Sequence, residues 1–445
     1  MAEKYLVIGA ARSGLAAAEY LAGKGEQVIL ADTNEKAREK AEANLKGLEI
    51  EYVWGIQPQV DASIRELVMS PGVPLTIAPV KKAKELGISV IGEVEMAYRV
   101  AKAPMVAITG TNGKTTTTSL VGEIFKNSGC ETAVGGNIGV PLLECAQKIS
   151  KDGVIVAEIS SFQLETIQDF CPKAAVILNL TPDHLDRHGD MEHYLLAKAN
   201  IFLNQSEDDL AILNYDDEYL RPLAERCKGK VLFFSRKHIL DEGVFVENGE
   251  IIVHWQEKRH KICDVKEVCL KGEHNLENAL AAVALSYGMG VSVAVISDTL
   301  KSFAGVEHRM EPVRVKDGVL YVNDSKGTNP DSTMKALGAY DEPIVLIAGG
   351  KNKGLSFVDL AELIKKKVRK TILVGMAKGD FKEAFAQVGY DDYLEADTFE
   401  EAVRLAAKEA VSGEIVLLSP ACTSWDMFQS FEERGALFKE IVNGL

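Results

Sequence analysis

The run Gly110-Thr111-Asn112-Gly113-Lys114-Thr115 combines small residues with a lysine and a hydroxyl group, which is typical of loops that bind phosphate. It follows the apolar run 105–109, an expected strand, and precedes an expected helix. Glycines let backbone N–H groups approach phosphate oxygens, and the helix N-terminus adds its positive dipole end. Lys114 would reach the β- and γ-phosphates, and the Thr115 hydroxyl would bind Mg²⁺. Ile108 stands where the first glycine of the usual spacing is expected, so a glycine-rich turn with a solvated lysine is the alternative.

Carboxylates and histidines follow two further expected strands. The apolar run 153–158 ends at Glu158, and a carboxylate at the carboxyl end of a parallel strand faces the ligand crevice, where it could hold Mg²⁺. Taken alone, a glutamate favoured by a helix N-terminus is an equally good interpretation. The next run, 174–179, leads into a cluster of ligand-type side chains, Asp183, His184, Asp186 and His188. This crowding favours a metal or proton-transfer role over a polar surface loop.

A second glycine-rich run lies near the N-terminus. Gly9-Ala10-Ala11-Arg12-Ser13-Gly14 follows an expected strand and opens an expected helix, and Asp32 ends the next expected strand. This arrangement is typical of dinucleotide-binding units, in which a pyrophosphate lies at the helix N-terminus and an acidic residue contacts a ribose. By itself it favours an NAD-dependent oxidoreductase. The signal is weak, since the same fold binds many ligands.

Alternating strands and helices would position these motifs in three successive α/β units. The expected strands of the first unit are 5–9, 27–32, 67–70 and 89–92. Those of the second unit are 105–109, 153–158, 174–179 and 210–214, followed by a small antiparallel patch within 231–270 and a helix at 275–287. Those of the third unit are 320–323, 344–348, 371–374 and 415–418. Such alternation implies parallel sheets covered by helices. We expect domains at 1–100, 101–306 and 307–445.

Composition argues against several classes of protein. A net charge of −15 argues against nucleic acid or an anionic membrane as the main partner. The most apolar long stretch, 279–296, contains glycines and polar residues, so it predicts a buried helix, a break and a new element, and no membrane insertion. The seven cysteines form an odd set with no C-x-x-C pair, which is typical of reduced thiols in a cytoplasmic protein.

Five motifs in order along essentially the whole chain resemble those of the Mur ligases of peptidoglycan synthesis: 110–115, 158–164, 179–186, 274–275 and 323–330. The resemblance implies three tandem α/β domains. These are a Rossmann-like N-terminal domain that binds a UDP substrate, a P-loop NTPase-like central domain that binds ATP, and a Rossmann-like C-terminal domain that binds an amino acid. The C-terminal run 419–428 is most similar to the members that add D-glutamate to UDP-N-acetylmuramoyl-L-alanine.

The resemblance implies an ATP-dependent ligase that needs Mg²⁺ and is expected to be a monomer. The substrate carboxylate attacks the γ-phosphate of ATP, and an amine then displaces phosphate from the acyl phosphate. The implied catalytic residues are Lys114, Glu158, His184 and Lys198. The implied Mg²⁺ ligands are Thr115, Glu158, His184 and a carbamylated Lys198. Without the resemblance, Lys198 would be interpreted as an ordinary lysine on a surface helix.

The remaining binding residues are also implied by the resemblance. The ATP-binding residues would be Gly110, Thr111, Asn112, Gly113, Lys114, Thr115, Thr116, Asn275, Asn278, Arg309, Asp324 and Lys326. The UDP substrate would contact Ala11, Arg12, Ser13, Asp32, Thr33, Ser70, Gly72 and Asn137. The amino acid would contact Thr328, Lys353, Ser424 and Phe431. Lys351 lies close enough to Lys353 to compete for its role, and Phe431 could equally be a packing residue.

Three other functions compete with ligation. A dehydrogenase that uses the N-terminal unit leaves the cluster from 105 to 188 unexplained. A nucleotide-dependent switch or transport ATPase leaves the 324–329 cluster without a task. A non-catalytic sugar-nucleotide sensor would be expected to lose Lys114, Glu158 or His184, and all three are present.

Overall fold

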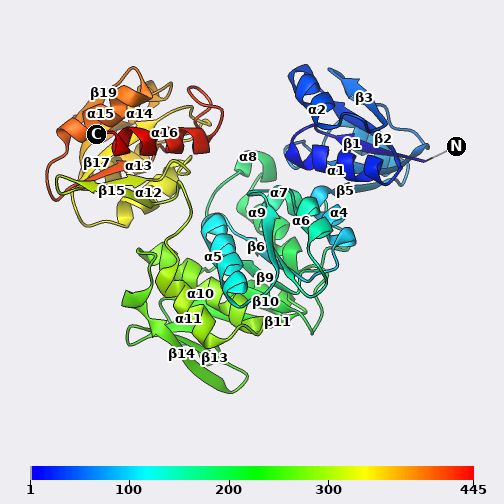
Figure 1. The fold of residues 1–445 in the computed structure, drawn as a ribbon, viewed down its shortest axis with the longest axis horizontal. Coiled ribbons are helices and arrows are strands. Elements are labelled where there is room, and N and C mark those ends of the chain that lie inside the picture. Colours follow the sequence, from blue (N-terminus) through cyan, green and yellow to red (C-terminus); the bar gives the residue numbers. More distant parts are fainter. Residues whose placement is uncertain (1–2) are drawn as a thin grey trace. The chain divides into compact units, whose positions relative to one another are not determined.

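The computed structural model describes residues 3–445, and the side chain of Asp186 lies outside what is described. The chain divides into two compact units, Met1–Val268 with Glu277–Ser302, and Cys269–Leu276 with Phe303–Leu445. The first unit contains a five-stranded and a nine-stranded sheet, and the second contains a six-stranded sheet (Figure 1). Most strands in all three sheets are parallel, which confirms the predicted fold class of three α/β domains.

The N-terminal sheet is entirely parallel, with strand order β3-β2-β1-β4-β5. Its strands are β1 (Lys4–Ile8), β2 (Gln27–Asp32), β3 (Ile50–Trp54), β4 (Ile64–Met69) and β5 (Ser89–Gly92). Its helices are α1 (Arg12–Gly23), η1 (Glu35–Ala37), α2 (Arg38–Asn44), α3 (Ala78–Glu85) and α4 (Glu93–Val100). The strand order reverses between β1 and β4, and ligands of such sheets bind outside the carboxyl ends of the strands at that point.

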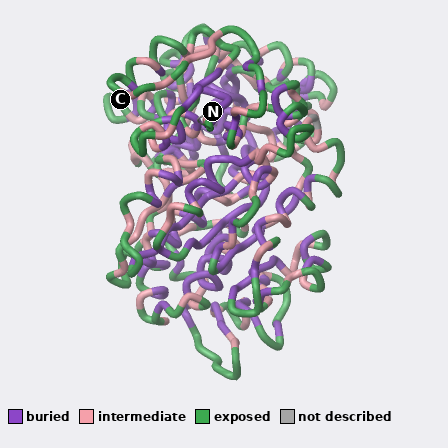
Figure 2. Tube along the Cα trace, turned by 90° about the vertical axis from the view of Figure 1, so that its right-hand side faces the viewer, coloured by how far each residue is buried: buried purple, intermediate pink, exposed green. Residues whose placement is uncertain are grey.

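The central sheet has the order β14-β13-β12-β11-β10-β9-β6-β8-β7. Its strands are β6 (Met105–Thr109), β7 (Thr132–Gly136), β8 (Val154–Glu158), β9 (Ala174–Ile177), β10 (Leu210–Asn214), β11 (Lys230–Ser235), β12 (Gly243–Glu247), β13 (Glu250–Trp255) and β14 (Lys258–Asp264). The last three form the predicted antiparallel patch, which extends the same sheet. Every residue of β6, β8 and β10 is buried, as expected for parallel strands covered on both faces (Figure 2).

Helices and 3₁₀ turns connect these strands. They are α5 (Lys114–Asn127), α6 (Leu142–Lys148), α7 (Ser161–Leu164), α8 (Leu185–His188), α9 (Met191–Ala199), η2 (Asn200–Phe202), η3 (Arg221–Arg226), η4 (Val265–Glu267), α10 (Glu273–Gly288) and α11 (Val293–Ser302). The break between α10 and α11 confirms the interpretation of the apolar stretch 279–296 as two elements. In the part of the chain that the structure describes, no helix is long and apolar enough to cross a membrane.

The sheet of the second unit has the order β15-β16-β20-β17-β18-β19, and only β15 is antiparallel to its neighbour. Its strands are β15 (Glu311–Lys316), β16 (Val319–Asn323), β17 (Ile344–Gly349), β18 (Val368–Val374), β19 (Tyr393–Glu395) and β20 (Ile415–Leu418). Alternate residues of β17 join different cores. Ile344 and Leu346 pack with α12 (Pro330–Gly338), α13 (Val358–Lys367) and α14 (Lys378–Val388). Val345 and Ile347 pack with α15 (Phe399–Glu409) and α16 (Phe431–Asn443).

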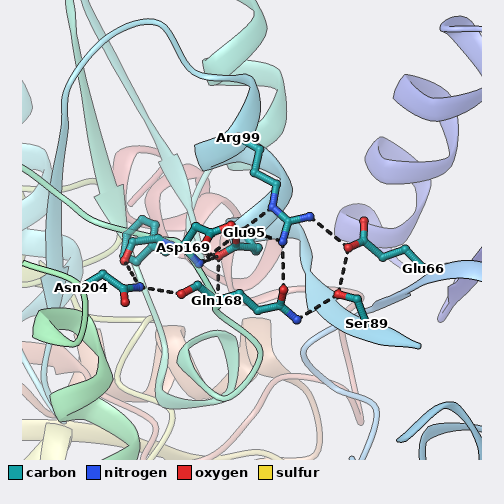
Figure 3. Close-up of polar contacts among 8 residues, drawn as sticks. Glu66, Ser89, Glu95, Arg99, Gln168, Asp169 and Asn204 are labelled. Atoms are coloured by element: carbon teal, nitrogen blue, oxygen red, sulfur yellow. Dashed lines mark hydrogen bonds and ion pairs between the residues drawn. The ribbon is translucent and has the colours of Figure 1, made fainter. Parts of the chain in front are cut away.

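A buried carboxylate joins α4 to the chain that follows α7 (Figure 3). Glu95 is fully buried and accepts hydrogen bonds from the backbone N–H groups of Gln168 at 2.8 Å and Phe170 at 3.0 Å. Arg99 donates to Glu95 at 2.9 Å and to Glu66, on β4, at 3.0 Å. Because the buried charge has several donors and a cationic partner, its desolvation is offset. This network ties the N-terminal sheet to the loops of the central sheet.

Candidate functional site

The register of the central sheet brings the predicted chemistry to one edge. On β6, Ile108 pairs with Glu158 of β8, and Thr109 pairs with Ile177 of β9. The three strands are parallel, so the glycine-rich loop after β6, the Glu158 carboxylate and the segment after β9 all leave the sheet at its carboxyl edge. Residues far apart in sequence therefore meet here because of strand order.

The glycine-rich loop is held in shape before any ligand arrives. Thr111 N–H donates to the Asn179 carbonyl at 3.0 Å, and Asn112 N–H donates to Asn179 Oδ1 at 2.9 Å. Lys114 Nζ donates to the carbonyls of Gly110 and Thr111, both at 2.8 Å. The lysine thus folds over its own loop at the start of α5. Asn179 was not predicted as a site residue. Its position, a polar residue at the end of an expected strand, is the sequence signal for such a role.

Gly113 is required by its surroundings as well as by its backbone. Its φ is +82°, and a Cβ there would lie 2.1 Å from Asn278 Oδ1 on α10. Any side chain at this position would displace either the loop or Asn278. The structure therefore places Asn278, a predicted ATP contact, directly against the glycine-rich loop.

Glu158 has one carboxylate oxygen in use and one free of hydrogen bonds. The residue is 1% exposed, and Asn137 Nδ2 donates to its Oε1 at 2.8 Å. Oε2 is buried with no hydrogen-bond partner. A buried carboxylate oxygen without a donor is costly unless a cation completes its shell. The Thr116 hydroxyl, in the first turn of α5, is also buried without a partner, so the residues at this edge fit an oxygen-liganded cation such as Mg²⁺.

Lys198 is buried at the same edge. Its side chain comes from α9, is 1% exposed, and donates from Nζ to the Gly110 carbonyl at 2.9 Å, so it shares this acceptor with Lys114. The ammonium group also lies 4.5 Å from the centre of the Tyr194 ring. Burial lowers the pKa of Lys198 well below its usual value, the neighbouring Lys114 charge lowers it further, and Asp183 partly opposes both. The structure thus overturns the alternative of a surface lysine.

His184 occupies a conformation that is uncommon for a histidine. Its φ is +52°, in the left-handed region, and its ring packs edge-on against Phe162 with centroids 4.8 Å apart. Backbone strain of this kind is often found at functional sites. Its Nε2 lies 3.6 Å from Asp183 Oδ2. No three His, Cys, Asp or Glu side chains among the described residues are grouped to hold a metal, so a cation here would need other ligands as well.

His188 is better connected than His184. Its Nε2 lies 3.0 Å from Ser161 Oγ, and its Nδ1 lies 3.5 Å from Glu165 Oε1. Burial lowers the pKa of His188, although the Glu165 carboxylate opposes this effect. The crowded segment after β9 contains both histidines, but only His184 was predicted as a site residue.

The N-terminal sheet carries a cavity of about 240 Å³ at the carboxyl ends of its strands. The predicted residues Asp32, Thr33 and Gly72 line it. Its apolar lining was not predicted, because it comes from loop residues with no motif: Ile56, Pro58, Val73, Pro74 and Ile77. A small cavity lined mainly by apolar residues, with Asp32, Thr33 and Gln57 as polar groups, suits a flat, polar ring.

The loop before α1 is braced by the same aspartate. Asp32 Oδ2 accepts from Ala10 N–H at 2.7 Å, and Ser70 Oγ donates to the Gly9 carbonyl at 2.9 Å. Arg12 is exposed, and its Nη1 donates to the Gly139 carbonyl at 2.8 Å. Because Asn137 in that same segment holds Glu158, residues 137–139 link the N-terminal loop to the carboxyl edge of the central sheet.

In the second unit, two of the predicted nucleotide contacts, Asp324 and Lys326, follow β16. Asp324 is buried, and it accepts from Ser419 Oγ at 2.8 Å and from Met310 N–H at 3.3 Å. Burial raises the pKa of Asp324 to about 6, although the Arg309 charge opposes the shift. Asn275 anchors the start of α10 by donating to the Lys271 carbonyl at 2.8 Å. The ammonium of Lys326 lies 5.2 Å from the centre of the Phe431 ring.

The predicted amino acid contacts lie on segments that follow β16, β17 and β20. Ser424 is 2% exposed, and its carbonyl accepts from Met427 N–H and Phe428 N–H. Thr423 and Lys351 exchange backbone hydrogen bonds of 2.9 and 3.1 Å, which join the β17 and β20 loops. Lys351 and Lys353 are both exposed, so the choice between them stays open.

Three family models match successive parts of the chain. A Mur ligase MurD-like N-terminal domain matches residues 3–92, a Mur ligase middle domain matches 108–286, and a Mur ligase glutamate ligase domain matches 308–422. The chain is 52% identical over 445 residues to the UDP-N-acetylmuramoylalanine–D-glutamate ligase of Pelotomaculum thermopropionicum, covering 100% of this chain and 98% of that protein.

The chain belongs to the Mur ligase family. A second relative, the UDP-N-acetylmuramoylalanine–D-glutamate ligase of Clostridioides difficile, is 46% identical over 446 residues, with 100% of this chain and 99% of that protein covered. The identity extends over all three sheets of this Mur ligase, so the resemblance predicted from its motifs is confirmed.

Solved structures of more distant relatives share the fold. The UDP-N-acetylmuramate–alanine ligase of Thermotoga maritima matches with a TM-score of 0.62 and 18% identity, covering 99% of both chains. The MurF ligase of Thermotoga maritima, solved in complex with ADP, matches with a TM-score of 0.62 and 17% identity, covering 100% of this chain and 98% of that one. The three-domain α/β architecture of this Mur ligase is therefore that of its family.

Proposed function

We propose that this Mur ligase uses ATP to join D-glutamate to the carboxylate of UDP-N-acetylmuramoyl-L-alanine during synthesis of the peptidoglycan precursor. The substrate class follows the relatives named above, which match the chain over its whole length. The observation that carries the chemistry is the pair of lysines, Lys114 and Lys198, which share one carbonyl of the glycine-rich loop at the same edge of the sheet as the free oxygen of Glu158.

The first step transfers the γ-phosphate of ATP to the substrate carboxylate, which forms an acyl phosphate and releases ADP. In this role the N-terminus of α5, where the glycine-rich loop ends, binds the phosphate oxygens, while the Thr111 and Asn112 N–H groups hold the loop on Asn179. Lys114 moves from its loop carbonyls to the phosphates and stabilises the charge that develops between them. The second step is attack by the glutamate amine on the acyl carbon, which expels inorganic phosphate.

Mg²⁺ fits the oxygen-rich edge of the central sheet. Thr115 and Glu158 would hold it, and His184 with a carbamylated Lys198 would help to hold a second ion. When bound, the metal neutralises phosphate charge and orients the reacting oxygens. The free Oε2 of Glu158 supports this assignment, since a cation would supply the missing partner.

Carbamylation of Lys198 is chemically reasonable at this position. A buried amine with a lowered pKa is partly neutral and therefore nucleophilic toward CO₂. The carbamate would replace a buried cation with an anion, which removes the repulsion between Lys198 and both Lys114 and a metal. Loss of activity in Lys198→Ala that short carboxylic acids restore would support this role, and loss without rescue would oppose it.

We propose that residues 1–100 bind the UDP substrate. The uracil ring would enter the cavity beside Asp32 and Thr33, and the pyrophosphate would lie at the start of α1, against Ala11, Arg12 and Ser13. Ser70, Gly72 and Asn137 would position the rest of the sugar nucleotide. The size and apolar lining of the cavity support a single flat ring.

We propose that residues 101–306 bind ATP and that 307–445 bind the amino acid. Asn275, Asn278, Arg309, Asp324 and Lys326 would contribute to the nucleotide site. The glutamate would contact the set Thr328, Lys353, Ser424 and Phe431. Cationic and hydroxyl groups in that set suit an acceptor that carries two carboxylates.

We infer a cytoplasmic monomer. All seven cysteines are free thiols, which supports a reducing compartment. Sedimentation equilibrium at micromolar concentration would give the mass of one chain, and a mass of two chains would contradict the inference.

The deciding experiment measures phosphate release from ATP and Mg²⁺ with UDP-N-acetylmuramoyl-L-alanine, with and without D-glutamate. Release that requires both substrates and yields a new UDP-linked product is expected. If phosphate were released only with a different amino acid, the proposed mechanism would stand and the proposed acceptor would be wrong. Absence of release with every amino acid would overturn the proposal.

A further inference from the structure

Arg434 is a buried cation at the centre of the second unit. It is the fourth residue of α16, and its side chain is 1% exposed. Within the described part of the chain, no carboxylate lies within ion-pair distance of its guanidinium group, and Asp426 and Asp324 act only from farther away. Burial lowers the pKa of Arg434 to about 10, so it still carries its charge at neutral pH. Burying a charge without an ion pair is expensive, which calls for an explanation.

The guanidinium group instead donates hydrogen bonds to two loops. Nε donates to Ser325 Oγ at 2.9 Å, and Nη2 donates to the Ser325 carbonyl at 2.7 Å. Nη1 and Nη2 both donate to the Cys422 carbonyl at 3.2 Å. Ser325 follows β16, and Cys422 follows β20. One planar group therefore fixes the distance between the two loops.

The same group reaches the N-terminus of α16 through a relay. Ser325 Oγ accepts from Arg434 and donates to the Phe431 carbonyl at 2.8 Å. The loop after β17 also lies close to Arg434. A Cβ built on Gly350 of that loop would lie 3.3 Å from Arg434 Nη1 and 2.3 Å from the Thr423 carbonyl oxygen. Four segments thus meet at Arg434, and they are the segments that carry Thr328, Lys353, Ser424 and Phe431.

We infer that Arg434 is a positioning residue for the acceptor amino acid: it locks the loops after β16, β17 and β20 and the start of α16 in the arrangement that binds glutamate. This inference rests on the proposed function, which assigns the glutamate contacts to these segments. The forked geometry of the guanidinium matters as much as its charge. A lysine has three donors on a flexible stem and cannot span Ser325 and Cys422 in the same way.

The test compares Arg434→Lys with Lys439→Met. Lys439 lies on the same helix but forms surface ion pairs with Glu307 and Glu311, away from the four segments. For Arg434→Lys, the KM for D-glutamate is expected to rise at least about tenfold, as for loss of a hydrogen bond to a charged group. The KM values for ATP and the UDP substrate should change less than about threefold. For Lys439→Met, all three values should stay within about twofold.

A second variant and a partial reaction keep the inference testable if Arg434→Lys is unstable. Ser325→Ala removes two hydrogen bonds, the one from Arg434 Nε and the one to the Phe431 carbonyl, and should raise the KM for D-glutamate by about three- to tenfold. Hydroxylamine attacks the acyl phosphate and displaces phosphate, so hydroxamate formation from ATP and the UDP substrate reports the first step without glutamate. Both Arg434→Lys and Ser325→Ala should form hydroxamate at near the unchanged rate.

The outcomes separate this inference from the proposed function. If the unchanged protein forms no hydroxamate and uses no D-glutamate, the proposed function fails first. If the unchanged protein is active but Arg434→Lys and Ser325→Ala leave the KM for D-glutamate unchanged, the positioning role is wrong. Equal rises in all three KM values would also overturn it, because they would indicate general damage to the unit.

Discussion

Two glycine-rich loops in this protein have the same local structure, but different side chains surround them. Each follows a buried parallel strand and opens a helix, β1 to α1 in one sheet and β6 to α5 in the other. The first loop is braced by a carboxylate, because Asp32 accepts from Ala10 N–H. The second is covered by two lysines that share the Gly110 carbonyl. We propose that both loops bind anions through their backbone and that only the second, with its two lysines, serves phosphoryl transfer.

Removal of Lys114 should have the largest effect. Lys114→Met takes away the cation that stabilises the transferring phosphoryl group, so kcat should fall by at least about 10²–10³ while the fold is retained. Phosphate release under saturating substrates measures the effect, and circular dichroism checks the fold. If this variant kept more than a tenth of the original kcat, the proposed difference in function between the two loops would be wrong.

Loss of the Glu158 charge should weaken metal use. Glu158→Gln keeps the hydrogen bond with Asn137 available but removes the negative charge that a cation requires. We expect the Mg²⁺ concentration for half-maximal activity to rise roughly 10- to 100-fold, the range seen when groups around metal sites are changed. A Mg²⁺ titration of phosphate release tests this, and an unshifted midpoint would remove Glu158 from the metal site.

Substitution in the first loop should affect binding alone. Arg12→Ala removes the bond to the Gly139 carbonyl and a cation at the proposed pyrophosphate site, so the KM for the UDP substrate should rise about tenfold. The kcat and the KM for ATP should stay within about threefold. A large fall in kcat would contradict a role in binding alone. It would indicate that residues 137–139 transmit changes from the first loop to Glu158.

The smallest expected effect concerns stability and pH. Glu93 is buried on α4 and accepts from Leu143 N–H at 2.6 Å, and the charge of Glu144 on α6 acts on it. Burial raises the pKa of Glu93 from 4.5 to about 7. Since the folded value exceeds the unfolded one, its contribution is full below pH 4.5 and is lost as pH rises through about 7.

The neutral variant Glu93→Gln should therefore gain stability relative to the original chain as pH rises from 4.5 to 7.5, by about 1–3 kcal/mol. Urea unfolding at pH 5.0 and 7.5 measures the difference. Glu144→Gln, on the other side of the contact, is the control and should change stability by less than about 0.5 kcal/mol. A difference for Glu93→Gln that does not depend on pH would contradict the assignment.

The sequence predicted much of the fold and the position of the glycine-rich loop between a strand and a helix. Continuous apolar runs such as 105–109 and 344–348 predicted buried parallel strands, and β6 and β17 confirm them. The edge strands β15 and β19 were not predicted, because neither has a continuous buried apolar run. Gly113 and Lys114 are recognisable from types and spacing alone, since a tight turn before a helix is a local structure.

The burial and contacts of Lys198 and Arg434 depend on the tertiary structure. Lys198 contacts the Gly110 carbonyl across 88 residues, and Arg434 contacts Ser325 across 109. Each lies in a helix whose sequence would suit a lysine or arginine facing solvent. Local sequence fixes a backbone conformation, but burial of a charge depends on which strands are neighbours and which loops they bring together. That order is set by packing over the whole domain, so it cannot be obtained from residue type and spacing alone.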